Sequence, residues 1–214
     1  MLRKAKVDTT WSSNLAYVVG VITADGNLSP DLRHIVITSK DEEMVQNCKK
    51  CLGLNNAIGM KSRGGSKYKK YYVLQFGDIN FFNFLTSIGL TPRKSLTLEE
   101  IEIPDKFYYD FFRGYLDGDG NISITKHPES SKDQVKVRLC SGSNIFLKWI
   151  HAKNIEHFKV SGGNICVSNI SSTNTLSYGK ADSLRILEKI YYPNATSLTR
   201  KKILAGRALG KNIK

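Results

Sequence analysis

The feature that most constrains the fold of this chain is an internal repeat. The segment "VVGVITADGNLS" at residues 18–29 matches "FRGYLDGDGNIS" at residues 112–123, so that Asp25 corresponds to Asp119. Two further pairs of segments match in the same order: "IVITSKDEEMV" (35–45) with "VRLCSGSNIFL" (137–147), and "VLQFGDINFFNFL" (73–85) with "TLSYGKADSLRIL" (175–187). The offset between copies changes once, within "TKHPESSKDQVK", whose Pro, Ser and charge are typical of a hairpin tip. A register kept over both halves indicates a duplication and predicts a monomer with internal pseudo-twofold symmetry.

Both halves have the same predicted order of elements, αββαββα. We expect helices at 14–26, 40–53 and 78–90 and at 106–118, 143–157 and 180–192, and hairpins pairing 27–29 with 32–39, 57–63 with 69–76, 121–126 with 134–140 and 164–169 with 173–178. Hairpins separated by helices predict an α+β fold, in which each half has an antiparallel four-stranded sheet with helices on one face. The predicted domains are residues 1–90 and 105–214, joined by a linker at 91–104.

The charge of the chain favours a polyanionic partner. Its 214 residues include 32 Lys and Arg against 19 Asp and Glu, which gives a net charge of +13 and makes nucleic acid the first candidate. The sequence has neither a long basic amphipathic helix nor an apolar run near the roughly 20 residues that a membrane span needs. The basic N-terminus lacks the apolar core of a secretion signal, so we expect an intracellular protein, cytoplasmic or organellar.

Strand alternation predicts which side chains reach the uncovered face of each sheet. Ile35 and Ile37 point toward the core, and His34, Val36 and Thr38 point the other way. The other side chains that we expect to contact DNA from the two sheets are Lys61, Arg63, Lys69, Tyr71, Gln75, Lys126, Lys136 and Arg138. Such side chains suit phosphates, base edges and stacking. The segments outside the sheets are expected to contact phosphates through Arg93, Lys94, Arg200, Lys201 and Lys202.

The two motif helices predict an acidic centre. Small residues at four-residue spacing, such as Gly20 and Gly114, allow two helices to approach closely, which would bring their C-terminal ends together. Asp25 and Asp119 would then lie a few ångströms apart, where two carboxylates are stabilised by a divalent cation. Oxygen ligands beside phosphate favour Mg²⁺, and two metal ions can clamp the attacking and leaving oxygens of a phosphodiester.

The motifs "VVGVITADG" and "FRGYLDGDG" resemble the two signature motifs of the LAGLIDADG homing endonucleases, and the resemblance covers nearly the whole chain. It implies a saddle of two sheets on a double-stranded DNA target of roughly 20 bp, or about two helical turns. It implies cleavage of both strands with two or three divalent ions, Mg²⁺ by preference and Ca²⁺ or Mn²⁺ as substitutes. The metal ligands that it implies are Asp25 and Asp119, together with Ala24 and Gly118.

The resemblance also implies a basic group that tunes the attacking water at the end of the second strand. In the first half this residue is Lys40, whereas the second half has Ser141 and Gly142 there, which leaves Lys180 as a weaker candidate. Thr23 stands where the family usually has an acid. Two other functions stay open at this point: an RNA-binding intron maturase on the same scaffold and a non-catalytic DNA-binding regulator. Retention of both motif acids favours the endonuclease.

Overall fold

The computed structural model describes residues 6–63, 66–127, 130–168 and 172–211, with side chains omitted at 63, 66–69, 127 and 130–132. Contacts divide the chain into two compact units, Met1–Lys94 with Ile101–Gly118, and Ser95–Glu100 with Asp119–Lys214. The units therefore differ from the sequence halves at the helix that carries the second motif, which belongs to the first unit as far as Gly118.

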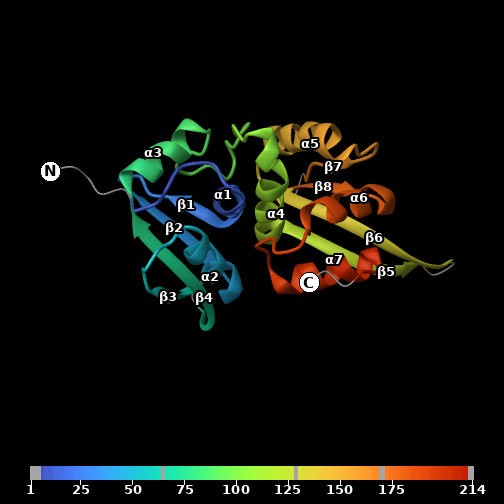
Figure 1. Cartoon of the computed structure of the whole chain (residues 1–214), viewed down its shortest axis with the longest axis horizontal. Coiled ribbons are helices and arrows are strands. Elements are labelled where there is room, and N and C mark those ends of the chain that lie inside the picture. Colours follow the sequence, from blue (N-terminus) through green and yellow to red (C-terminus); the bar gives the residue numbers. More distant parts are fainter. Residues whose placement is uncertain (1–5, 64–65, 128–129, 169–171, 212–214) are drawn as a thin grey trace. The chain divides into compact units, whose positions relative to one another are not determined.

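The first unit begins with helix–hairpin–helix–hairpin–helix, as the repeat predicts (Figure 1). Its elements are α1 (Ser13–Asp25), β1 (Gly26–Leu28), β2 (His34–Ser39), α2 (Glu42–Cys51), β3 (Ile58–Arg63), β4 (Ser66–Gly77) and α3 (Ile79–Ser87), followed by the short 3₁₀ helix η1 (Asp105–Phe107) and by α4 (Tyr108–Asp119). Ser12 caps α1, because its hydroxyl accepts a hydrogen bond of 3.1 Å from the backbone N–H of Leu15.

The second unit repeats the two hairpins and their helices. Its elements are β5 (Gly120–His127), β6 (Ser130–Ser141), α5 (Asn144–Phe158), β7 (Asn164–Cys166), β8 (Asn174–Tyr178), α6 (Lys180–Ile190) and α7 (Thr199–Leu209). Helix α7 was not predicted. Leu198, at its N-cap position, makes no side-chain capping bond, so the usual sequence signal for a helix start is missing. The helix contacts β5 and α6.

Each unit contains one antiparallel four-stranded sheet, and the two sheets have the same topology. The strand orders are β1-β2-β4-β3 and β5-β6-β8-β7. Along β2, buried and half-buried residues alternate from His34 to Ser39, and Ile35 and Ile37 are fully buried. Helices contact one side of each sheet in its own unit, which leaves the other side open. The predicted α+β fold with helices on one face is confirmed.

The motif helices pack backbone to backbone inside the first unit, as their glycine spacing predicted. A Cβ atom on Gly20 would overlap the carbonyl oxygen of Phe111 and lie 2.7 Å from the nitrogen of Tyr115. A Cβ on Gly114 would likewise overlap the carbonyl oxygen of Tyr17. Two helices can approach this closely only where neither carries a side chain at the crossing. None of the described helices is long and apolar enough to cross a bilayer.

Candidate functional site

The two motif acids end their helices, and each is followed by a glycine that begins a strand. Asp25 is the last residue of α1 and Asp119 is the last residue of α4, and both are half-buried. A Cβ on Gly26 would lie 2.6 Å from the carbonyl oxygen of Ile22, so this position accepts only glycine. The chain can therefore turn from helix to strand within one residue, which presents the acid at the turn.

At the other motif helix, Gly118 brings the backbone of α4 against the end of α1. A Cβ on Gly118 would overlap the Cβ of Ala24 and lie 3.3 Å from Oδ2 of Asp25. The carboxylate of Asp25 is therefore directed toward the last turn of α4. A carboxylate at the C-terminal end of a helix is opposed by the helix dipole, at a cost of about 0.3–1 kcal/mol.

Two buried lysines supply positive charge at these helix ends, one in each unit. The amine of Lys94 donates a hydrogen bond to the carbonyl oxygen of Gly26, and the amine of Lys201 donates one of 2.8 Å to that of Gly120. The two lysine residues are 6% and 2% exposed. Because each carbonyl directly follows a motif acid, both acids have the same arrangement: a helix end, a glycine and a buried ammonium group. A cation near a helix C-terminus offsets the dipole.

This placement corrects the expectation that Lys94 and Lys201 contact phosphates. Lys94 lies in an irregular segment and Lys201 in the first turn of α7, each directly after an arginine. In both pairs the arginine, Arg93 or Arg200, is exposed whereas the lysine is buried. Sequence reasoning could not separate the two residues of each pair. An Arg-Lys pair follows the third helix of each half, and the sequence-based prediction assigned both residues of each pair to phosphate contacts.

The first unit contains a buried polar network between α1 and α4. Asp117, the other acid of the second motif, is 1% exposed and accepts a 3.0 Å hydrogen bond from the hydroxyl of Tyr17. The guanidinium of Arg113 lies 5.7 Å from the centre of the Tyr17 ring and forms a 2.6 Å ion pair with Asp110. Burial, with the Asp117 charge second, raises the pKa of Tyr17 well above its usual value. Asp117 therefore has a structural role inside the helix pair.

Thr23, at the corresponding position in α1, forms its side-chain hydrogen bond within its own helix. Its hydroxyl donates a 2.8 Å hydrogen bond to the carbonyl oxygen of Val19 and is buried. The departure from the family acid at this position therefore leaves no unsatisfied group. Nearby, burial raises the pKa of the Cys48 thiol well above its usual value, and the charges of Asp117 and Asp25 contribute after that of Cys51.

Lys40 lies beyond the end of β2, on the open side of the first sheet. Its amine is 5.8 Å from the centre of the Tyr71 ring, and the residue is exposed. Gly26 pairs with Ile37, three residues before Lys40, which places Lys40 about 10 Å along the strand from the level of Gly26, the residue that follows the first acid. A lysine side chain can span much of that distance.

Lys180 is not a basic helper for the second acid, which corrects the second candidate. Its amine donates a 2.7 Å hydrogen bond to the carbonyl oxygen of Asp133. Asp133 is six residues along β6 from Leu139, the residue that pairs with Gly120, and this separation corresponds to about 20 Å. Offsets in the sequence located the residue on α6 but could not show which end of the sheet it faces.

The open face of the first sheet carries polar and basic groups. His34, Val36 and Thr38 are half-buried on this face, and Gln75 and Lys61 are exposed. His34 forms a short contact through Nδ1 with the carboxylate of Asp31, which also accepts hydrogen bonds from the backbone N–H groups of Arg33 and His34. The bond from His34 is the main reason that the pKa of Asp31 is lowered well below its usual value.

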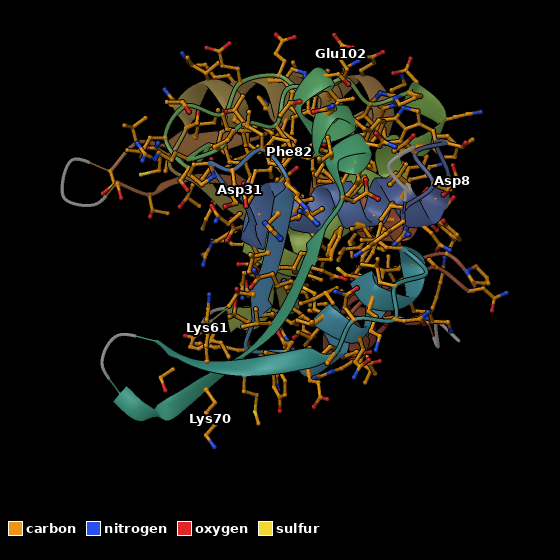
Figure 2. All side chains as sticks on the ribbon, turned by 90° about the vertical axis from the view of Figure 1, so that its left-hand side faces the viewer. Asp8, Asp31, Lys61, Lys70, Phe82 and Glu102 are labelled. Carbon is orange, nitrogen blue, oxygen red and sulfur yellow. The ribbon has the colours of Figure 1, made fainter. Side chains whose placement is uncertain are left out.

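The hairpin of β3 and β4 extends beyond the helices. Lys61 pairs with Tyr71, so Lys61 and the neighbouring Lys70 project to opposite sides of the hairpin (Figure 2). The side chains of Arg63 and Lys69, which were also expected to contact DNA, lie outside the described residues.

The open face of the second sheet is more basic along β6. Lys136 and Arg138 are exposed on this face, whereas Val137, between them, and Leu139 are buried, as alternation predicted. Lys126, on β5, is also exposed, but it pairs with Asp133 and lies on the same face as the buried Ile122, which corrects its assignment to the open face. The strand register places Arg138 in one row across the sheet, beside three residues that sequence reasoning did not name: Asn121, Ser177 and Asn164. The same alternation, applied to β5, β7 and β8, would have identified them.

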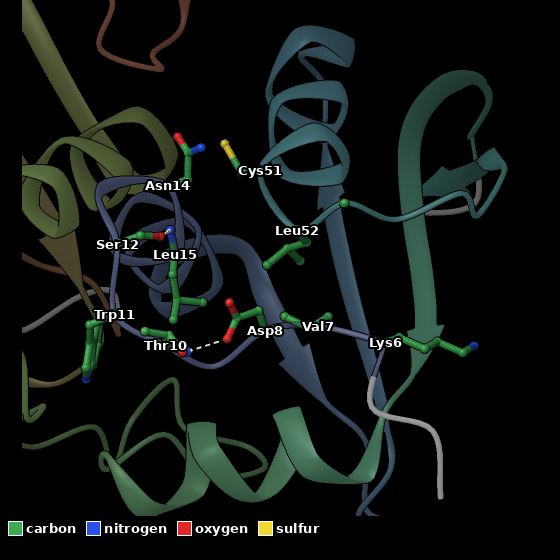
Figure 3. Close-up of a pocket in the computed structure, with 11 residues that line it drawn as sticks. Lys6, Val7, Asp8, Thr10, Trp11, Ser12, Asn14, Leu15, Cys51 and Leu52 are labelled. Atoms are coloured by element: carbon green, nitrogen blue, oxygen red, sulfur yellow. Dashed lines mark hydrogen bonds between the residues drawn. The ribbon is translucent and has the colours of Figure 1, made fainter.

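A cavity of about 410 Å³ lies away from these groups (Figure 3). It is formed around the start of α1, where Thr10 donates a 2.8 Å hydrogen bond to Asp8 and where Trp11, Ser12 and Cys51 contribute to the wall. Asp25 is at the other end of α1, about 18 Å along the helix axis. The cavity and the acid therefore belong to different regions of the first unit.

Solved structures resemble this chain over nearly its whole length. The homing endonuclease I-WcaI, bound to its DNA recognition sequence, has a TM-score of 0.64 at 11% identity, over 96% of this chain and 90% of its own. The homing endonuclease I-DmoI, in complex with DNA and Ca, has a TM-score of 0.59 at 15% identity, over 91% and 97%. Another I-DmoI complex contains DNA and Mn. This chain has the LAGLIDADG fold.

The same fold occurs in WhiA. Full-length WhiA from Thermatoga maritima matches with a TM-score of 0.59 at 17% identity, over 95% of this chain. The chain spans about 62% of the length of WhiA, whose N-terminal part is a LAGLIDADG domain. No protein-family model matches the sequence, and neither does any curated protein sequence. At these identities, the resemblance establishes the LAGLIDADG fold alone.

Proposed function

We propose that this chain is a site-specific DNA endonuclease that hydrolyses phosphodiester bonds in both strands with the help of Mg²⁺. One observation carries the proposal: both motif acids stand at a helix end beside a glycine carbonyl that a buried lysine holds. A protein that only folds or only binds DNA gains nothing from placing two acids in duplicate at helix C-termini, where the helix dipole opposes them.

The donor atoms near the acids suit a hard cation. Asp25 and Asp119 offer carboxylate oxygens, both residues are half-buried, and Ala24 and Gly118 are the predicted additional ligands. Oxygen-only donors beside phosphate favour Mg²⁺, which would supply the charge that stabilises the attacking and leaving oxygens. I-DmoI, which shares the fold, has been solved with DNA and either Ca or Mn.

The remaining chemistry belongs to residues of the chain itself. We propose that Lys40 holds the attacking water in the first half, because its amine is exposed on the open face near the level of Asp25. Lys94 and Lys201 stabilise the helix ends that present the acids. The open sheet faces, with Arg138 and Gln75 exposed, would contact bases in a long duplex target, and the net charge of +13 would draw phosphates to them.

A second function is a non-catalytic DNA-binding protein. The observation that favours it is the LAGLIDADG fold of WhiA, which is similar to this chain over 95% of its length. The two functions make different demands on the acids: a binder without catalysis would tolerate, and even benefit from, removal of negative charge near a phosphate backbone.

Cleavage of a randomised duplex library distinguishes these functions. We expect the protein to cut a small subset of sequences in Mg²⁺ and to lose all cleavage in EDTA. The double variant Asp25→Asn, Asp119→Asn should keep its folding and DNA binding but show no product. Glu42→Gln, which removes an exposed acid from α2, is the matched control and should cut normally. Cleavage by the double variant in Mg²⁺ would show that the acids have been assigned wrongly.

A further inference from the structure

One row of side chains on the open face of the second sheet carries no charge. Thr175 on β8 pairs with Cys140 on β6 at one side and with Cys166 on β7 at the other. Each of these residues stands two positions along its strand from the row of Arg138, so alternation puts both rows on the same face of the sheet. We call the three residues the Thr175 row.

The Thr175 row offers an apolar surface. Cys140 and Thr175 are half-buried and Cys166 is exposed. The sulfur of Cys140 lies 3.9 Å from the hydroxyl oxygen of Thr175, so the polar atoms of this pair have each other as partners within the row. A thiol behaves as a small apolar group with a weak donor, and threonine adds a methyl group. The row therefore lacks the long side chains that make bidentate contacts with purines.

The Thr175 row lies at the level of the second motif acid. Gly120, which follows Asp119, pairs with Leu139, and Cys140 is the next residue along β6. A basic side chain at this level would form an ion pair with the carboxylate that the proposed function assigns to Mg²⁺, and an acidic one would repel phosphates. A neutral row avoids both interactions and leaves the base edges to be contacted by apolar groups.

The first sheet has a neutral row at the corresponding positions of the repeat. Thr38 on β2 pairs with Val73 on β4, and Val73 pairs with Gly59 on β3. Thr38 and Val73 are half-buried, and they match Cys140 and Thr175 in the two copies of the sequence. The residues differ between the sheets, but their small size, their apolar groups and their lack of charge are shared. A shared chemistry in different residues indicates that both rows contact the same kind of group.

Among the base edges of the major groove, the C5-methyl group of thymine is the one apolar group, because the edges of guanine, adenine and cytosine present nitrogen and oxygen atoms. We propose that the Thr175 row and the pair of Thr38 and Val73 each pack against the C5-methyl group of a pyrimidine. The preferred target would then have a methylated pyrimidine, which is thymine in unmodified DNA, at one inner position of each half of the site. This proposal rests on the DNA binding that is part of the proposed function.

The test replaces thymine by uracil, which lacks only the C5-methyl group. A duplex is selected from the randomised library by binding in Ca²⁺, so that its recovery does not depend on cleavage, and each thymine is replaced in turn. We expect uracil at one position in each half of the site to weaken binding by about fourfold, the effect of exposing one buried methyl group. At the same positions, 5-methylcytosine should bind more tightly than cytosine by a similar factor, because it carries the same methyl group.

Two variants assign the methyl contacts to their rows. Thr175→Ser removes one methyl group and keeps the hydroxyl beside Cys140, so it should abolish most of the uracil effect in one half of the site and leave the other half unchanged. Thr38→Ser should do the reverse. The matched control is Thr125→Ser. Thr125 is exposed on β5 and pairs with Gln134, six residues or about 20 Å along β6 from Cys140, so its replacement should leave both uracil effects unchanged.

The outcomes separate this proposal from the one on which it rests. Uracil without effect at every thymine, or uracil effects that Thr175→Ser and Thr38→Ser leave unchanged, would overturn the methyl contacts while leaving the endonuclease function intact. The expected uracil effects on a duplex that is bound but never cut in Mg²⁺ would support the methyl contacts and overturn the endonuclease function. A library in which no duplex is bound or cut would overturn both.

Discussion

Arg200 and Lys201 are neighbours in the sequence with opposite environments. The side chain of Arg200 is exposed, whereas the amine of Lys201 is bonded to the carbonyl oxygen of Gly120 inside the second unit. An exposed guanidinium can displace counterions from DNA, but a buried ammonium that is already bonded to the protein cannot. The two residues should therefore affect different measurable quantities.

The first residue-scale prediction is a contrast in salt dependence. Arg200→Ala should weaken binding to all duplexes and make the log–log salt slope shallower by about 0.9, the value for one phosphate contact. Lys201→Met should leave this slope unchanged and slow cleavage by roughly 10² or more, because it removes the charge beside Asp119. Binding is measured in Ca²⁺ at several salt concentrations, and thermal melting checks that both variants fold. A shallower salt slope for Lys201→Met would show that Lys201 contacts a phosphate, as the sequence had predicted.

At the scale of elements, the crossing of α1 and α4 determines how the motif ends are presented. Gly20 and Gly114 lie where each helix contacts the backbone of the other. The buried pair of Tyr17 and Asp117 crosses the same interface. Because backbone atoms cannot move aside as a flexible side chain can, the crossing tolerates no added methyl group.

The element-scale prediction is that Gly20→Ala and Gly114→Ala each destabilise the first unit by about 3 kcal/mol, at the upper end of the usual cost of overpacking. For a chain of this size, the melting temperature should fall by about 10 °C. The control is Gly59→Ala, whose added Cβ would come no nearer than 4.0 Å to another segment and whose melting temperature should not fall. An unchanged melting temperature for Gly114→Ala would mean that the helices do not cross at this residue.

For the whole molecule, affinity and specificity should come from different residues. The net charge of +13 attracts any duplex, whereas Arg138, exposed on the open face of the second sheet, is placed to contact base edges. Its neighbours across the sheet, Asn121 and Ser177, can hydrogen-bond in the same row. Groove-facing residues of this kind discriminate between sequences, and phosphate contacts do not.

The molecule-scale prediction compares a cognate duplex with a scrambled one. Arg138→Ala should weaken binding to the cognate site by about 1–3 kcal/mol, relax the preference at one or two base pairs and leave binding to the scrambled duplex nearly unchanged. A fluorescence titration with each duplex at fixed salt measures both effects. Equal weakening on both duplexes would make Arg138 a phosphate contact and would contradict its assignment to base recognition.

The sequence by itself determined the order of the elements in its two repeated halves and the faces of most of their strands. These properties depend on residues close together in the chain: the alternation around Ile35 and Ile37, the cap at Ser12 and the glycines that follow Asp25 and Asp119. Helix α7 was not predicted from the sequence because Leu198, its N-cap residue, has no side chain that can cap a helix. These strands and helix ends could be predicted because alternation, a capping residue or a glycine marked them in the sequence.

Only the tertiary structure decided which basic residues are buried and which are exposed. Lys94 lies in an irregular segment, and Lys201 lies in the first turn of α7, a helix that the sequence did not predict, so no expected periodicity related either residue to the inside or the outside of the fold. The distance of Lys180 from Gly120 and the close packing of Ser95 against Gly142 depend on backbone from segments far away in the chain. Burial at such positions is set by which segments pass beside them, and a pattern of neighbouring residues carries no information about that.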